Sequence, residues 1–280
     1  MLKKRTITSL WYVSLLVVVV WFGGKPGFTA LMVIFGVLAA LEFYRMVATA
    51  KVPPLTYFGL VWTAFFILSR NSELLSLLEV HFNPDLLMPL LLTSAVVLSL
   101  IGILARRQKE GAFTSWAWTM AGILYIGWLL SHMVALRGLP DSDIVGRNLV
   151  FFVLFVTWVS DTTAFFIGRR FGQHKLAPSI SPGKTWEGTI GGICGAIAMS
   201  TLFFAPTPFQ LPLVYWQAIL LSALASILGQ VGDLAESLLK RNMGVKDSGW
   251  LMPGHGGILD RIDSLVFAGT VVYYSAIWAV

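Results

Sequence analysis

Long apolar runs alternate with short polar connections along the chain, and this pattern predicts helices that span a membrane. A spanning helix needs about 20 mostly apolar residues. Nine runs come close to that length, the third and the last being the least secure: residues 7–23, 28–47, 55–69, 86–105, 113–136, 149–168, 188–205, 213–230 and 264–280. The pattern therefore predicts an all-α polytopic integral membrane protein with about nine transmembrane helices, five in residues 1–147 and four in a C-terminal region, residues 148–280.

Composition agrees with this prediction and excludes a soluble globule. Of the 280 residues, 56% are hydrophobic and 12% are charged, and the mean hydropathy is +0.77. This leaves too little polar surface to cover a soluble protein of this size. The only cysteine, Cys194, lies in an apolar run, so neither an intrachain disulfide nor a cysteine metal cluster can form.

The basic residues predict which way the helices cross the membrane. If successive connections alternate between the two sides, 16 of the 20 Lys and Arg residues fall on the side of the N-terminus. The positive-inside rule then predicts a cytoplasmic N-terminus, nine spans and an outward-facing C-terminus. The first run is longer than a usual signal peptide core and lacks a small-residue cleavage site, so it is interpreted as a retained span.

The formal charge of +6 could indicate nucleic acid as a partner. The cations flank the spans on one side instead of forming a basic arm, however, and this favours anionic lipid head groups and phosphates.

Two long polar connections, after the sixth and eighth runs, are the places to look for chemistry. Residues 237–263 hold four cations, three carboxylates and a histidine among several glycines. A simple link between two membrane helices does not need this density of charge, so the segment indicates function. Both connections are predicted on the cytoplasmic side, where they can form one site.

Asp161 lies inside the sixth run, 8 residues before Arg169, which is roughly 12 Å along a helix. Intramembrane acids usually face a bundle interior or a water-filled cavity, so Asp161 is a functional candidate. The alternative is a carboxylate that neighbouring hydroxyls satisfy. Glu42, by contrast, is expected to pair locally with Arg45.

The segment Ser181–Thr185 reads Ser-Pro-Gly-Lys-Thr and leads directly into the seventh run. The N-terminus of a helix favours an anion, and Lys184 with the two hydroxyls would add donors for a phosphate. A Walker A loop is excluded, because Pro178 stands where its first glycine should be. The alternative is a capped helix with a basic residue at the membrane edge.

Carboxylates at helical spacing are candidates for a metal site. If the eighth run stays helical, Asp233, Ser237 and Lys240 share one side of it, although together with Glu236 they could also form an ordinary salt-bridge face. Asp260 and Asp263 are three residues apart, so one helical turn would aim both at one point. Paired carboxylates suit Mg²⁺, which also keeps waters and substrate phosphates as ligands.

These motifs resemble the phosphatidate cytidylyltransferases, also called CDP-diacylglycerol synthases. The family signature S-x-x-K-R-x4-K-D-x-G, followed by H-G-G-x-x-D-R-x-D, is matched over 27 residues, and the element S-P-x-K-T/S-x-E-G also recurs. The residues that match are Ser237, Lys240, Arg241, Lys246, Asp247, Gly249, His255, Gly256, Gly257, Asp260, Arg261 and Asp263, with Ser181, Pro182, Lys184, Thr185, Glu187 and Gly188. The first five spans match only in hydropathy and number.

The resemblance implies that CTP and phosphatidate react to give CDP-diacylglycerol and pyrophosphate, with Mg²⁺ and a second cation, monovalent or divalent. It implies a multi-pass protein of a bacterial-type inner membrane, an active site facing the cytoplasm, membrane lipids as partners and a homodimer. Metal ligation is assigned to Asp233, Asp260 and Asp263. Catalytic roles are expected for Asp161, Ser181, Lys184, Lys240, Lys246, Asp247, His255 and Arg261, and substrate binding for Lys184, Thr185, Arg241, Lys246, His255, Gly256, Gly257 and Arg261.

Two other functions remain as alternatives. CTP-dependent lipid kinases resemble parts of the C-terminal region, although the complete signature favours nucleotidyl transfer. A secondary transporter would place charges such as Asp161 at mid-bilayer; here most charges lie in the polar connections. The D-G-x2-A-R motif of CDP-alcohol phosphotransferases is absent from the sequence.

Overall fold

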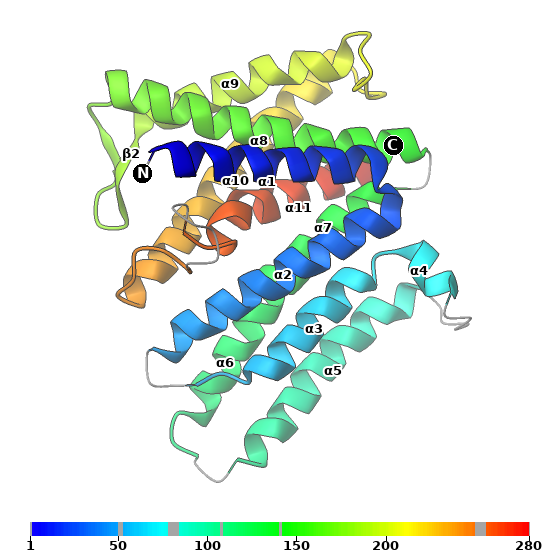
Figure 1. Cartoon of the computed structure of the whole chain (residues 1–280), viewed down its shortest axis with the longest axis vertical. Helices are drawn as coiled ribbons and strands as arrows, with labels where there is room; N and C mark the ends of the chain where they lie inside the picture. The colour runs from blue at the N-terminus through cyan, green and yellow to red at the C-terminus, as the bar shows by residue number, and fades with distance from the viewer. Residues whose placement is uncertain are drawn as a thin grey trace. The chain divides into compact units, whose positions relative to one another are not determined.

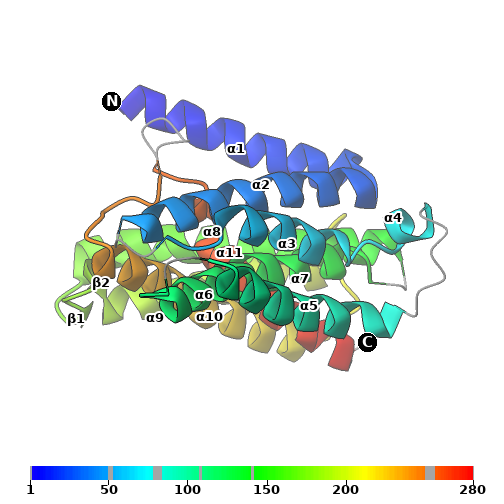
Figure 2. The same ribbon diagram turned by 90° about the horizontal axis from the view of Figure 1, so that it is seen from below.

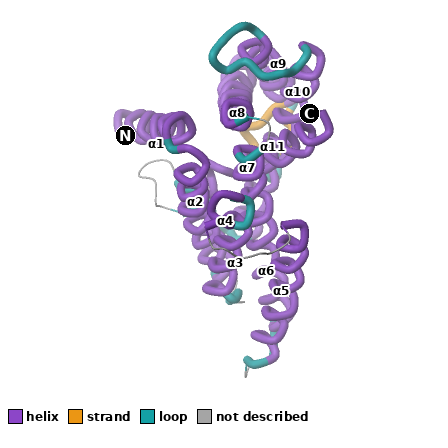
Figure 3. Tube along the Cα trace, turned by 90° about the vertical axis from the view of Figure 1, so that its right-hand side faces the viewer, coloured by secondary structure: helices purple, strands orange, loops and turns teal. Residues whose placement is uncertain are grey.

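The structure is a computed structural model that describes residues 2–49, 53–77, 84–106, 109–139, 142–249 and 256–279. These residues are almost entirely helical (Figures 1 and 3). They form two compact units, Met1–Gly138 with Met243–Asp260, and Leu139–Asn242 with Arg261–Val280. The predicted division into residues 1–147 and 148–280 stays a prediction.

The first unit contains the N-terminal helices. They are α1 (Leu2–Phe22), α2 (Gly24–Ala48), α3 (Thr56–Leu68), α4 (Ser72–Leu77), α5 (Pro84–Leu104), α6 (Ala112–Gly122) and α7 (Leu129–Arg137), and a π-helical segment, Ile123–Trp128, joins the last two. In Figure 1, α3 runs between α2 and α5. Two glycines allow this close packing, because a Cβ atom on Gly59 or Gly122 would lie 2.2 or 2.5 Å from the hydroxyl of buried Tyr44. That hydroxyl donates a hydrogen bond to the carbonyl of Thr119 at 2.8 Å.

The second unit contains α8 (Asp143–Phe171), α9 (Trp186–Phe204), α10 (Tyr215–Asn242) and most of α11 (Leu259–Ala279). Helices α8 and α9 lie side by side (Figure 1). Glycines on α9 make this possible: a Cβ atom on Gly188 would stand 2.8 Å from the carbonyl oxygen of Ala164, and one on Gly195 would stand 2.3 Å from Thr163 Oγ1. The backbone of α9 therefore approaches α8 more closely than a helix with larger residues could.

A short β-hairpin, which the hydropathy pattern did not predict, connects α8 to α9. Strand β1 (Lys175–Ala177) pairs antiparallel with β2 (Ser181–Thr185), with Lys175 opposite Thr185 and Ala177 opposite Ser181. Figure 2 shows the two strands near the ends of α8 and α9. The predicted start of a helix directly after Thr185 is confirmed, since α9 begins at Trp186.

The nine predicted runs are helical over nearly all of their described length. Six helical stretches are long and apolar enough to cross a membrane: residues 24–48, 86–104, 112–137, 143–171, 186–204 and 215–242. The described chain therefore confirms an all-α fold of the membrane type, while the count of nine spans and the cytoplasmic N-terminus stay predictions. Helix α10 continues to Asn242, well beyond the predicted apolar run.

Candidate functional site

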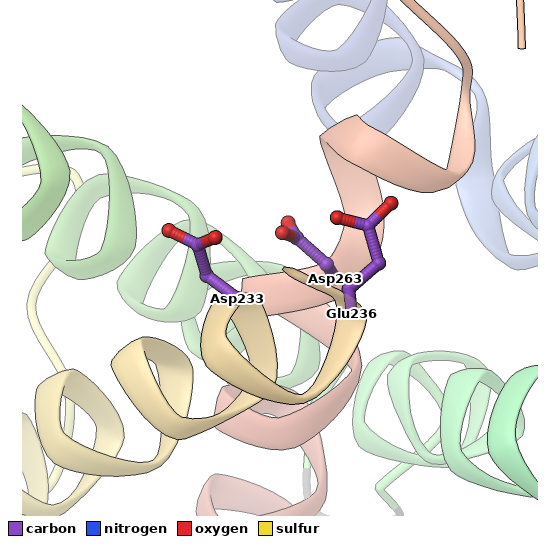
Figure 4. Close-up of side chains that lie close together, drawn as sticks. All are labelled: Asp233, Glu236 and Asp263. Atoms are coloured by element: carbon purple, nitrogen blue, oxygen red, sulfur yellow. The ribbon is translucent and has the colours of Figure 1, made fainter. Parts of the chain in front are cut away.

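Three carboxylates from two helices meet in the second unit. Asp233 and Glu236 lie on α10, and Asp263 lies on the second turn of α11. One oxygen of each lies within 4.8 Å of the others, and Figure 4 shows the three side chains close together. Glu236 is 1% exposed and Asp263 is 7% exposed. Because carboxylates so close together and so buried repel one another, they need positive charge nearby.

Two lysines supply some of that charge. Lys184 Nζ lies 2.9 Å from Asp233 Oδ2, and Lys240 Nζ lies 2.5 Å from Glu236 Oε2 one turn along the same helix. Both lysines were predicted as catalytic residues, and both are only partly exposed. The structure thus places two predicted site residues directly on the acidic cluster.

The hairpin brings Lys184 to this position. Next to it, Thr185 caps α9, because its Oγ1 accepts a hydrogen bond from the amide of Gly188 at 3.1 Å. Glu187, in the first turn of α9, contacts His174 Nδ1 at 2.6 Å, just before β1. Strand β2 is therefore fixed to the helix that follows it, and Lys184 projects from an ordered segment.

Helix α10 holds the hairpin from the other side. Arg241 Nε donates to the carbonyl of Ile180 at 3.2 Å, in the turn between the strands. Lys184 Nζ also contacts the carbonyl of Gln230 at 3.3 Å. Of the remaining hairpin residues, Ser181 is half-buried at the start of β2. Arg241, predicted to bind substrate, thus has a structural contact as well.

Asp161, on α8, belongs to the same electrostatic group. Its carboxylate interacts with Asp233, Lys184 and Arg261. The alternative, a carboxylate satisfied by its neighbours, gains no support from the hydroxyls of Thr162 and Thr163. They donate to the backbone carbonyls of Trp158 and Val159, both at 2.7 Å, so their protons are not available to Asp161.

Asp260 has different partners from Asp263, although the two were predicted to point at one cation. Its Oδ2 accepts from the amide of Gly257 at 2.7 Å, the amide of Ser248 at 3.1 Å and the hydroxyl of Ser248 at 2.9 Å. These partners all lie in the first unit. Gly256 has φ of +81°, and a Cβ atom there would stand 2.5 Å from the same oxygen. Asp260 therefore organises the polar loop before α11.

Other predicted residues of the loop differ in their exposure to solvent. Lys246 and Asp247 are exposed, and Gly257 is buried. His255 lies outside the described residues. Ser237, the first residue of the signature, lies on α10, and its hydroxyl donates to Asp233 Oδ1 at 3.4 Å.

Two acidic residues in these arrangements were not predicted as site residues. Glu236 takes the place in the cluster that the sequence suggested for Asp260. The three-residue separation of Glu236 from Asp233 indicated that both lie on one side of the helix. The same spacing also fits a salt-bridge face, and Lys240 does pair with Glu236. Glu42 turns to the loop before α11 and accepts from the amide of Leu259 at 3.0 Å, whereas Arg45 is exposed. The predicted local pair with Arg45 was wrong, and no local pattern could reveal a partner so distant in sequence.

Comparison with known proteins gives a consistent result. A model of the cytidylyltransferase family matches residues 3–278. A phosphatidate cytidylyltransferase of Brucella abortus (strain 2308) is 35% identical over 287 residues, which covers 99% of this chain and 94% of that protein. One from Bacillus subtilis (strain 168) is 34% identical over 277 residues, covering 98% and 97%. An uncharacterized Escherichia coli protein, YnbB, is 42% identical over 160 residues, or 57% of this chain and 51% of that protein.

Proposed function

We propose that this chain, which belongs to the cytidylyltransferase family and is a nucleotidyltransferase, makes CDP-diacylglycerol and pyrophosphate from CTP and phosphatidate. The observation that supports this most directly is the cluster of Asp233, Glu236 and Asp263 with Lys184 and Lys240 beside it. Carboxylates with neighbouring lysines suit a reaction between a triphosphate and a phosphate, both of which are anions.

The acidic cluster fits a divalent cation. All three ligands offer carboxylate oxygens, the donors that Mg²⁺ prefers, and their mutual distances of up to 4.8 Å are compatible with a shared ion. Asp233, Glu236 and Asp263 would hold it, with Asp161 as a candidate for an outer or additional ligand. The bound cation would supply positive charge against the triphosphate.

Charge explains why the carboxylates and the cation belong together. Three carboxylates and two lysines carry a formal charge of −1, which repels CTP. One divalent cation would change that to +1, which attracts it. Lys184 and Lys240 would then be able to exchange a carboxylate partner for a phosphate oxygen.

The reaction itself needs little proton chemistry. A phosphate oxygen of phosphatidate, already anionic, attacks the α-phosphorus of CTP, and the bond from that phosphorus to the pyrophosphate oxygen breaks. The site residues therefore have to bring two anions together and stabilise the charge that moves to the leaving group. Lys184 would do so from the hairpin and Lys240 from α10. Arg241, next to Lys240 on α10, and Arg261, on α11, would add further positive charge.

The proposed location is the cytoplasmic edge of a bacterial-type inner membrane. CTP is water-soluble, and phosphatidate keeps its acyl chains in the leaflet, so the site has to be open to both phases. The basic residues at the last turns of α8 and α10 support a cytoplasmic position for that end of the second unit. A homodimer and a second cation remain part of the proposal on family resemblance alone.

Incubation of the purified protein with CTP, phosphatidate and Mg²⁺, followed by lipid analysis, tests the function. We expect the label of CTP radiolabelled in cytidine to enter the lipid, and the γ-phosphate label to leave as pyrophosphate. A lipid that carried the γ-phosphate label instead would identify a kinase. Absence of CDP-diacylglycerol would overturn the proposal.

A further inference from the structure

Glu42 is a buried acid far from the signature in sequence, and it contacts the polar loop of the first unit. It lies on α2 and is 2% exposed. Its Oε2 accepts a hydrogen bond from the amide of Leu259 at 3.0 Å and lies 3.4 Å from the hydroxyl of Ser248. Burying a carboxylate is costly. A buried acid that binds a segment more than 200 residues away therefore indicates that this segment has to be held in place.

The bond to Leu259 caps α11. Leu259 is the first residue of this helix, and the first amides of a helix have no acceptor within the helix itself. A carboxylate at this end also interacts favourably with the helix dipole. Glu42 therefore supplies from α2 the acceptor that a local N-cap residue would normally provide.

The cap matters because of what α11 carries. Asp263 lies four residues after Leu259, about 6 Å along the helix axis. The position of the first turn of α11 determines where the Asp263 carboxylate lies. A displacement of this turn would move Asp263 relative to Asp233 and Glu236, which lie on α10.

Two signature glycines pack directly on the Glu42 carboxylate. A Cβ atom on Gly249 would stand 2.3 Å from its Oε1, and one on Gly257 would stand 2.3 Å from its Oε2. Both positions therefore exclude side chains as long as Glu42 keeps its place. The loop backbone before and after residues 250–255 thus contacts the same carboxylate. Asp260, in the first turn of α11, binds Ser248 and Gly257 of this loop.

We propose that Glu42 is a positioning residue for nucleotidyl transfer, which holds the signature loop and the first turn of α11 so that Asp263 reaches its working position. The inference rests on the proposed function for its kinetic consequence, but the contacts themselves can be tested without any activity. It also gives Glu42, on α2, an indirect part in the proposed reaction through the first turn of α11.

A pair of variants separates the hydrogen bond from mere packing. Glu42→Gln keeps an oxygen acceptor for Leu259, whereas Glu42→Met keeps the approximate volume and loses the acceptor. We expect Glu42→Met to lower kcat roughly 10- to 100-fold, as changes behind a metal ligand do, with KM for phosphatidate little changed, and Glu42→Gln to retain most of the activity. Glu73→Gln, an exposed acid on α4, is the matched control and should behave as wild type.

Hydrogen exchange in detergent, without substrates, gives a readout independent of activity. The amides of residues 256–260 should exchange faster in Glu42→Met than in wild type or Glu42→Gln. Unchanged exchange together with wild-type kcat in Glu42→Met would overturn the proposal, and so would equal losses of kcat in Glu42→Met and Glu42→Gln. If the wild type makes no CDP-diacylglycerol, the proposed function fails, and the exchange experiment still decides on the contact.

A double-variant cycle guards against a variant that does not fold. Gly249→Ala should impair the enzyme because its Cβ atom meets Glu42. Glu42→Asp withdraws the carboxylate by about 1.5 Å, one methylene group, and should leave room for it. We expect the double variant to be more active than the product of the two single effects, as contacting residues are coupled. Independent effects would exclude the proposed contact.

Discussion

At the scale of single residues, the three clustered acids do not have equivalent surroundings. Asp233 is half-buried and contacts Lys184, whereas Glu236 is buried and contacts Lys240. Asp263 is buried, with Asp233, Asp161 and Lys240 as its electrostatic neighbours. Because two of these neighbours are acids, Asp263 needs added positive charge, and its substitution tests the proposed metal site.

We therefore expect Asp263→Asn to lower kcat by on the order of 100-fold or more, since one oriented charge is lost from a water-poor site. Asp143→Asn, an exposed acid at the opposite end of α8, serves as the matched control and should keep wild-type activity. Turnover of purified protein at saturating CTP and phosphatidate is the measurement. Near-normal turnover of Asp263→Asn would remove it from the metal site.

Asp260 should differ from Asp263 in a measurable way. Its Oδ2 already accepts hydrogen bonds from Gly257 and Ser248, and asparagine retains one oxygen that can accept the bond from Gly257. We expect Asp260→Asn to bind Mn²⁺, a spectroscopic substitute for Mg²⁺, within about threefold of wild type, whereas Asp263→Asn loses roughly 10-fold or more in affinity.

Electron paramagnetic resonance of free Mn²⁺ measures both affinities on the same preparations. Equal losses in the two variants would return Asp260 to the metal ligands that the sequence suggested.

These residues also show the limit of sequence spacing. The three-residue spacing of Asp260 and Asp263 indicated a helical turn, and both do lie in α11, but the spacing carried no information about the loop that binds Asp260. Lys184 and Asp233 were each recognised from their own motif, while their contact at 2.9 Å depends on the hairpin. Glu42 could not be found, because its partners are set by tertiary packing and its nearest cation in sequence suggested a local pair.

At the scale of elements, the contact between α8 and α9 determines where the hairpin can lie. Gly188, a residue of the S-P-x-K-T/S-x-E-G element, lets the first turn of α9 approach Ala164 and Gly168 on α8. The same turn is capped by Thr185. The glycine in this motif therefore has a packing reason, next to any role in binding phosphate.

Gly188→Ala should destabilise the protein by about 1 to 3 kcal/mol, because the new Cβ atom would overpack against a backbone oxygen that cannot rotate away. Gly27→Ala, on α2, is the control, since a Cβ atom there meets nothing within 4 Å. Thermal unfolding in detergent should show a lower midpoint for Gly188→Ala alone. Equal midpoints would show that the two helices can separate without cost.

Helices were easier to predict than the elements between them. Apolar runs of membrane length are a strong signal, and α2, α5, α8 and α9 begin and end within several residues of the predicted spans. The hairpin gave no signal because its strands are three and five residues long, too short for an alternating pattern. The π-helical segment at Ile123–Trp128 likewise continues an apolar run without any change in hydropathy.

At the scale of the whole molecule, orientation in the membrane decides which substrates can reach the site. Hydropathy alone cannot give it, since an apolar helix is as stable in either direction, and the asymmetry of Lys and Arg is the physical basis for the prediction. The turn between β1 and β2 should face the cytoplasm, and the connection between α9 and α10 should face the opposite side.

Cysteine labelling tests this orientation with a matched pair of sites. With Cys194 replaced by alanine, Ser179→Cys and Gln210→Cys each place one thiol at an exposed position, before and after α9 respectively. In sealed right-side-out vesicles, we expect a membrane-impermeant maleimide to label Gln210→Cys and to leave Ser179→Cys unlabelled until the vesicles are opened.

Inside-out vesicles should give the opposite result, which controls for differences in thiol reactivity. The reverse pattern would place Lys184 and the acidic cluster on the outer side, away from cytosolic CTP, and the proposed reaction could then not proceed in the cell as described. Labelling of both sites from one side would show that α9 does not cross the membrane, and the predicted count of nine spans would be wrong.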